Sequence, residues 1–155
     1  MAITKLIADS ITSGAIANTP AFWSYATGTT SLPNATGTKI TNLTDYIDTN
    51  NAFASSRFTV PSGQDGKYVF FGTLAMSTNT TILVGFGLNG TPNPSFLGGY
   101  DTWHELNSER GNNNSIIFDL VAGDYVELYG YQASGGSVNA NAGRTRFYGY
   151  KLIGI

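Results

Sequence analysis

Hydrophobic residues in this chain come in short runs, separated every few residues by Gly, Asn, Thr and Ser. The runs are rich in aromatic and β-branched residues, whereas the separators are residues that interrupt helices. Long helical patterns are nearly absent. The pattern predicts an all-β fold, a sandwich or barrel built from many short strands.

We expect eight to ten antiparallel strands and no helix. The long polar stretches 109–115 and 132–143 are expected to be loops because Gly, Asn and Ser dominate them. The clearest predicted strands are 21–27, 67–77, 81–88, 115–121, 125–132 and 144–155, with weaker ones at 38–43, 57–60 and around 96–103.

Some predicted strands carry apolar residues on both faces. In the run KYVFF, Tyr68 and Phe70 point to one side and Val69 and Phe71 to the other. In a sheet with one solvent-exposed face, apolar and polar residues would instead alternate along each strand. One face can fill the core of a sandwich, so the other face must meet a partner. The run YVELYGY raises the same question, because one side of it carries Tyr125, Glu127, Tyr129 and Tyr131.

The first 20 residues differ from the rest and suggest a separate N-terminal arm, followed by one domain over 21–155. This segment has only two charges, Lys5 and Asp9, and no strict alternation. It is either a frayed terminus or an arm that orders on a partner. Its spaced aliphatic residues are Ile3, Leu6, Ile7, Ile11 and Ile16.

Composition narrows the function classes. The 155 residues are 41% hydrophobic and only 12% charged, against about 25% charged in a typical domain. A net charge of −2 with scattered basic residues argues against nucleic-acid binding. No apolar run approaches the length of a membrane span, and the N-terminal segment does not resemble a signal peptide. The absence of cysteine excludes disulfides, thiol nucleophiles and cysteine-ligated zinc.

No catalytic or cofactor-binding pattern stands out. His104, the only histidine, has Asp101 and Glu105 nearby, but acid–base or metal chemistry needs more converging groups. The run GFGLNG at 85–90 matches a dinucleotide fingerprint by letter only, since the prolines that follow prevent the required helix. The scattered turn carboxylates lack calcium-loop spacing. We therefore expect no enzyme activity, metal or cofactor.

Three motifs in order resemble a known family. The first has an acidic residue, aromatic residues and Gly-x-Tyr-x-Phe; the second is Leu-x-x-Gly-Asp-x-Val-x-Leu; the third is an aromatic C-terminal strand. The matching residues are Asp48, Phe53, Phe58, Gly66, Tyr68 and Phe70, then Leu120, Gly123, Asp124, Val126 and Leu128, then Phe147, Gly149, Tyr150 and Leu152. Over about 21–155 the chain resembles the trimeric jelly-roll family of the complement first-component globular head and tumour necrosis factor. It departs from that family in a longer turn before Gly66 and in lacking a collagen stalk.

The resemblance implies an antiparallel jelly-roll sandwich in which one sheet packs around a threefold axis. Its register places in the subunit core Tyr68, Phe70, Leu120, Val126, Leu128 and Tyr150. It places at the homotrimer interface Val69, Phe71 and Phe147, with Tyr125, Tyr129 and Tyr131 as further candidates.

A second resemblance concerns the N-terminal segment followed by such a head, which looks like virion structural proteins of bacteriophages. It implies a homotrimeric capsid decoration (cement) protein on the virion surface, with the arm bound to the major capsid protein. The alternative is the head of a tail fibre or spike, bound to a fibre component and to a host surface glycan. A third class is a secreted ligand or complement-like recognition protein.

Overall fold

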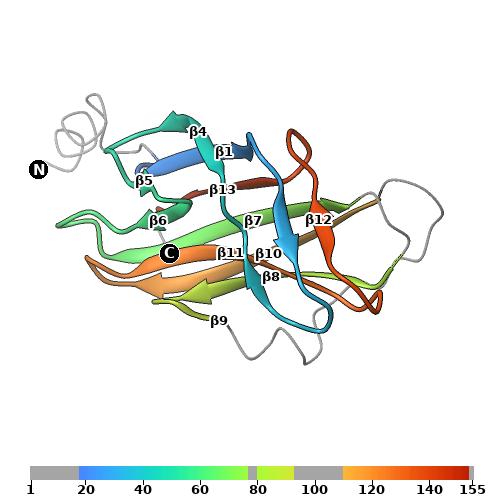
Figure 1. Ribbon diagram of the computed structural model, residues 1–155. Helices are drawn as coiled ribbons and strands as arrows, with labels where there is room; N and C mark the ends of the chain where they lie inside the picture. The colour runs from blue at the N-terminus through green and yellow to red at the C-terminus, as the bar shows by residue number, and fades with distance from the viewer. Residues whose placement is uncertain (1–17, 77–79, 93–109, 154–155) are drawn as a thin grey trace, which may run out of the picture.

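The computed structural model describes residues 18–76, 80–92 and 110–153. These residues form thirteen β-strands and no helix (Figure 1). Accordingly, no helix in the described part of the chain could cross a membrane. The strands are β1 (Ala21–Ala26), β2 (Thr30–Leu32), β3 (Thr38–Lys39), β4 (Leu43–Asp48), β5 (Phe53–Ala54), β6 (Arg57–Thr59), β7 (Gly66–Met76), β8 (Ile82–Leu88), β9 (Thr91–Pro92), β10 (Arg110–Leu120), β11 (Tyr125–Gln132), β12 (Val138–Ala140) and β13 (Arg146–Lys151).

The strands form two sheets that pack face to face. Sheet A has the order β2-β12-β7-β13-β1-β4, with β10 paired to β7 on its other side. Sheet B has the order β5-β6-β11-β8-β9, with β3 also paired to β11. Every pairing is antiparallel. The expected all-β antiparallel jelly roll is confirmed.

The described residues contain more strands than the eight to ten expected. Short strands lie in segments expected to be turns or loops; an example is β12 within 132–143. The largest difference is β10, because residues 110–114 were expected to be a polar loop and instead extend the strand along β7. Other expectations concern residues outside the described ranges: the strand around 96–103, the group Asp101, His104 and Glu105, and the arm residues Ile3, Leu6, Ile7, Ile11 and Ile16.

Aromatic rings fill the space between the two sheets. Phe22 stacks on Phe53 and Phe58 at ring-centroid distances of 4.9 and 5.1 Å, and meets the edge of Phe147 at 4.8 Å. Burying each such side chain stabilises the fold by roughly 1.5–3 kcal/mol. Five of the predicted core residues are buried as expected: Tyr68, Phe70, Leu120, Val126 and Leu128.

The register of the last strand differs by one residue from the expected one. In β13, Phe147 is 0% exposed and lies in the core, so its predicted place at a subunit interface is wrong. Tyr150 was expected in the core but is half-buried on the opposite face, stacked on Phe71. Because side chains alternate along a strand, a shift of one residue exchanges the two faces.

The Gly-Asp motif forms the turn between β10 and β11. Gly123 has a positive φ of 91°, which favours glycine. The Asp124 carboxylate accepts hydrogen bonds from the Asn89 side-chain amide at 2.9 Å and from the Val121 backbone N–H at 2.9 Å. These two bonds, the Asn89 bond first, hold the pKa of Asp124 below its usual value. The motif therefore joins the β10–β11 turn to the β8–β9 turn.

Candidate interaction surface

The outer face of sheet A carries a row of half-buried aromatic side chains. In the ladder, Phe71 of β7 lies opposite Tyr148 of β13, which lies opposite Trp23 of β1. Residues directly opposite one another project from the same face of a sheet. We call the following six residues the aromatic face: Trp23, Tyr25, Val69, Phe71, Tyr148 and Tyr150.

The rings of the aromatic face pack on one another along the sheet. Phe71 stacks on Tyr148 with ring centroids 5.1 Å apart and an interplanar angle of 13°. Trp23 lies 5.8 Å from Tyr25 and meets Tyr46 of β4 edge-on at 5.3 Å. These contacts hold the rings in place while leaving them accessible in the single chain. Large apolar surfaces of this kind mark interaction sites in soluble proteins.

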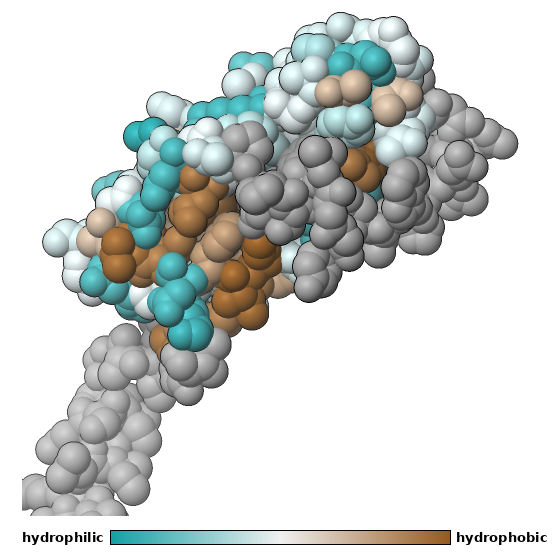
Figure 2. All heavy atoms as spheres, turned by 90° about the horizontal axis from the view of Figure 1, so that it is seen from below, coloured by the Kyte–Doolittle hydropathy of each residue, from teal (hydrophilic) through white to brown (hydrophobic). Residues whose placement is uncertain are grey.

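Aliphatic side chains extend this surface at its margins. Ile47 lies opposite Trp23 and is 50% exposed, and Ile117 of β10 lies opposite Val69 and is 57% exposed. Figure 2, seen from the side where β8, β9 and β10 lie in Figure 1, shows apolar side chains gathered in a band beside polar ones. The ion pair between Lys67 and Asp119, at 3.3 Å, is exposed and lies on the outer face of the same sheet. An apolar centre with a polar rim is the common anatomy of a protein interface.

The three tyrosines of β11 lie on the outer face of the other sheet. Val126 and Leu128 point into the core, so Tyr125, Tyr129 and Tyr131 point away from it on sheet B. They therefore do not lie on one continuous surface of the subunit with Val69 and Phe71, and that Tyr125, Tyr129 and Tyr131 contact another subunit stays a prediction. That Val69 and Phe71 contact another subunit stays a prediction. Sequence reasoning missed four residues on their face, because hydropathy alone does not separate outer from inner aromatic rings: Trp23, Tyr25, Tyr148 and Tyr150.

The outer face of sheet B is occupied by contacts within the subunit. Glu127 is only 5% exposed, and its carboxylate accepts a hydrogen bond from Lys39 Nζ at 2.6 Å. The hydroxyl of Tyr129 donates to the same carboxylate at 3.4 Å. Burial first, and then the Glu127 charge, raise the pKa of Tyr129. The Arg57 guanidinium lies 4.4 Å from the centre of the Tyr125 ring.

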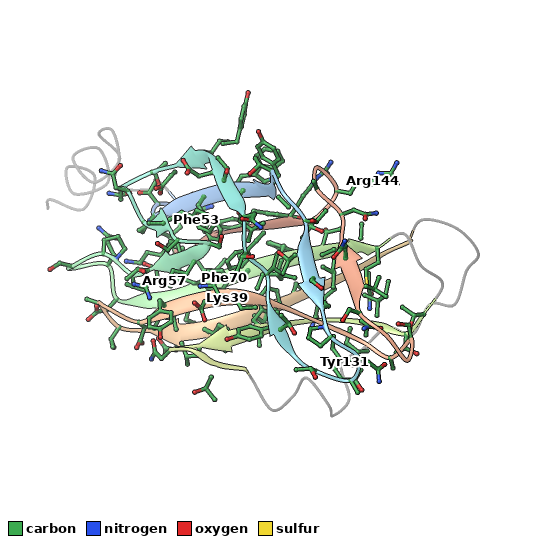
Figure 3. All side chains as sticks on the ribbon, in the orientation of Figure 1. Lys39, Phe53, Arg57, Phe70, Tyr131 and Arg144 are labelled. Atoms are coloured by element: carbon green, nitrogen blue, oxygen red, sulfur yellow. The ribbon has the colours of Figure 1, made fainter. Side chains whose placement is uncertain are left out.

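This network explains why a glutamate shares one side of β11 with three tyrosines. Lys39 lies in β3 and Arg57 lies in β6 (Figure 3). Both of these strands pair with β11, which also pairs with β8. Their cationic ends meet the carboxylate and a ring, so the polar groups of this face have partners in the same chain.

No converging set of ionisable groups marks a metal or catalytic centre in the described ranges. Among those residues, no three His, Asp or Glu side chains lie close enough to hold a metal ion. The feature that most distinguishes the described surface is therefore the aromatic face.

Solved structures show what this architecture is similar to. Murine APRIL superposes with a TM-score of 0.56 at 12% identity, covering 85% of this chain and 98% of that one. The globular domain of zebrafish complement 1qA gives 0.55 at 14%, covering 86% and 97%. The tumour necrosis factor Eiger from S. frugiperda gives 0.53 at 13%, covering 85% and 91%.

No family model matches the sequence, and no curated protein sequence matches it significantly. At 12–14% identity, the structural likeness concerns the fold alone. The architecture expected from the three motifs is thus confirmed: the chain has the jelly-roll fold seen in tumour necrosis factor and in the complement globular head.

Proposed function

We propose that this chain is a homotrimeric structural protein in which the β7 and β13 part of the aromatic face of sheet A forms the subunit interface. The single observation that carries the proposal is the set of half-buried rings on that face, with Phe71 and Tyr148 at its centre. Obligate interfaces resemble a domain core cut in half, and this face has the corresponding composition. The number three comes from the resemblance to the trimeric jelly-roll family. No reaction is assigned to the chain.

The contrast between the two outer faces supports this choice. Sheet B satisfies its polar groups internally through Lys39, Glu127 and Tyr129. Sheet A leaves Phe71 and Tyr148 with neighbours on the sheet but without a covering layer among the described residues. Covering one such half-buried ring would stabilise the assembly by about 1 kcal/mol per subunit, roughly half the value for burying a fully exposed ring.

We further propose that the trimer decorates a bacteriophage capsid from the outside. The N-terminal segment supports this role, since it carries aliphatic residues and few charges and resembles segments of virion proteins. An apolar segment that stays in water gains nothing, whereas one that orders on a shell buries those groups. The partner would be the major capsid protein, and the contacting residues would be Ile3, Leu6, Ile7, Ile11 and Ile16.

Co-sedimentation with undecorated capsids tests the capsid role. We expect the full chain to pellet with the capsids and a chain lacking residues 2–19 to remain a trimer in the supernatant. A matched control keeps the length but replaces the five aliphatic arm residues by Ser, and it should also fail to pellet. Equal binding by all three forms would remove the arm from the proposal.

The alternative is the head of a tail fibre or spike. On that account no form pellets with capsids, and the full chain is instead retained by a tail component or by host-surface glycan. Imaging of labelled virions separates the two, because label covers the shell in one case and marks the tail tip in the other.

A further inference from the structure

An open groove lies at the β1–β4 end of the aromatic face. Its volume is about 360 Å³, and its walls are Trp23, Tyr25, Tyr46, Gly143 and Arg146. Trp23 and Tyr46 stand nearly perpendicular, at 85°, and Tyr25 continues the surface along β1. Gly143 leaves one side open, since a Cβ there would meet no atom within 4 Å. The volume falls near the lower end of the ~300–1,000 Å³ range of small-ligand sites.

Among the described residues that wall this groove, one is a cation: Arg146, from the neighbouring strand. Arg146 lies directly opposite Tyr25 in the β1–β13 ladder and is exposed. It makes no ion pair with any described residue. Lys39 and Lys67, by contrast, pair with carboxylates. The groove therefore combines aromatic rings with a planar guanidinium that has no acidic partner in the described part of the chain.

We propose that this groove binds a carboxylated sugar unit of a glycan, a uronic or sialic acid. A pyranose ring presents an apolar C–H face, which packs on the ring faces of Trp23 and Tyr25. Its carboxylate matches the fork of donors of Arg146, which binds carboxylates through two parallel hydrogen bonds. The rings select a flat, partly apolar ligand, and the guanidinium selects its negative charge.

The site extends the proposed function rather than depending on the capsid role. The groove lies at the margin of the aromatic face, on β1 and β4, whereas the proposed subunit contact is centred on β7 and β13. A trimer that covers Phe71 and Tyr148 can leave Tyr46, which is 74% exposed, open to solvent. Glycan binding and trimer formation are therefore measured separately.

Saturation-transfer NMR and titration calorimetry on the full chain test this proposal. The probes are a glucuronic-acid-containing tetrasaccharide and sialyllactose, each with its neutral counterpart, chitotetraose and lactose. We expect at least one acidic probe to bind about tenfold more tightly than its counterpart, the size of one charge-assisted hydrogen bond. The acidic probe that binds shows whether the recognised carboxylate belongs to a uronic acid or to a sialic acid.

Variants of exposed residues place the binding in the groove. Arg146→Gln should lower affinity for the acidic probe about tenfold and leave the neutral sugar unchanged. Tyr46→Ala should weaken both. Lys67→Gln is the matched control: it removes another exposed cation from the same sheet and should change nothing.

Three results would overturn the proposal. The first is no binding by either acidic probe at millimolar concentration. The second is an equal loss of affinity in Arg146→Gln and Lys67→Gln, which would reveal general charge attraction. The third is dissociation of the assembled protein by Tyr46→Ala or Arg146→Gln, detected by light scattering, which would make the groove a subunit contact.

Discussion

At the scale of single residues, position along a strand decides what an aromatic ring does. Phe147 and Tyr148 are neighbours in β13, yet Phe147 packs on Phe22 and Phe86 in the core while Tyr148 stacks on Phe71 outside it. Both are large and aromatic, so hydropathy alone does not assign their faces. The ladder with β7 does, because Phe147 lies opposite Gly72 and Tyr148 opposite Phe71.

Replacing Phe147 by Ala should therefore destabilise the subunit itself. The lost ring leaves a cavity in a fully buried site, and we expect the free energy of unfolding to fall by about 3–5 kcal/mol. Urea denaturation followed by tryptophan fluorescence measures the change. Tyr46→Ala is the matched control, since it removes an exposed ring and should cost less than about 1 kcal/mol. Similar losses in both variants would contradict the assigned register.

A second residue-scale prediction concerns alkaline pH. Burial, followed by the charge of Asp65, raises the pKa of Tyr68 to about 12, against about 10 in the unfolded chain. Its hydroxyl donates to the Gln64 carbonyl oxygen at 2.5 Å. A raised pKa favours the neutral form in the folded state, so this contribution is complete below pH 10 and is lost as pH rises to about 12.

The comparison of wild type with Tyr68→Phe isolates this contribution. The wild type should lose up to about 2 kcal/mol of its stability advantage over the variant between pH 10 and pH 12. Urea unfolding at several pH values measures it, and the other tyrosines cancel in the difference. A difference that stays constant over this interval would show that the hydroxyl of Tyr68 is not protected.

At the scale of elements, β10 joins the edges of the two sheets through side chains. Asn112 Nδ2 donates to the Ile82 carbonyl oxygen at 2.7 Å, and Asn114 Nδ2 donates to that of Val84 at 2.8 Å. Both acceptors belong to β8 of sheet B, while the β10 backbone pairs with β7 of sheet A. The amides therefore bridge a gap that no backbone ladder spans.

Replacing Asn112 by Ala should weaken this junction. Asn112 is buried, and its loss would leave the Ile82 carbonyl without that donor, at a cost of about 1–3 kcal/mol. Asn113→Ala is the control, because Asn113 is exposed and its side chain accepts a hydrogen bond from Thr73 within sheet A. Urea denaturation measures the loss in free energy of unfolding for each variant. Amide hydrogen exchange along β8 should be faster in Asn112→Ala than in the wild type. Equal effects of the two substitutions would mean that the bridge contributes nothing.

The element scale also shows what the sequence could and could not predict. Apolar runs located β7, β8 and β11, and the period of two along AFWSYA could have grouped Trp23 with Tyr25 on one face, but not shown that Ser24 rather than the two rings faces the core. The run 110–114 looked like a loop because the asparagines that complete its strand find their partners on β8, far along the chain. The faces of β13 were exchanged because 147–150 offers aromatic residues on both sides, and only pairing with β7 resolves which side is buried.

At the scale of the whole molecule, the two outer faces of the sandwich differ in composition. Sheet B closes its polar network within the subunit, through the 2.6 Å pair of Lys39 and Glu127. Sheet A presents stacked rings and, at its margin, an arginine-containing groove. A chain with only 12% charged residues suits an assembly in which one face of each subunit is covered. The central claim is that this covered face is the outer face of sheet A.

Light scattering coupled to size-exclusion chromatography tests that claim most directly. At micromolar concentration the wild type should have three times the 16.5 kDa mass of one chain, and Phe71→Asp should be monomeric or aggregated because a buried charge without a partner is costly. Tyr131→Asp, an equivalent change on the outer face of sheet B, should remain a trimer. A monomeric wild type, or dissociation by Tyr131→Asp while Phe71→Asp stays assembled, would contradict the account.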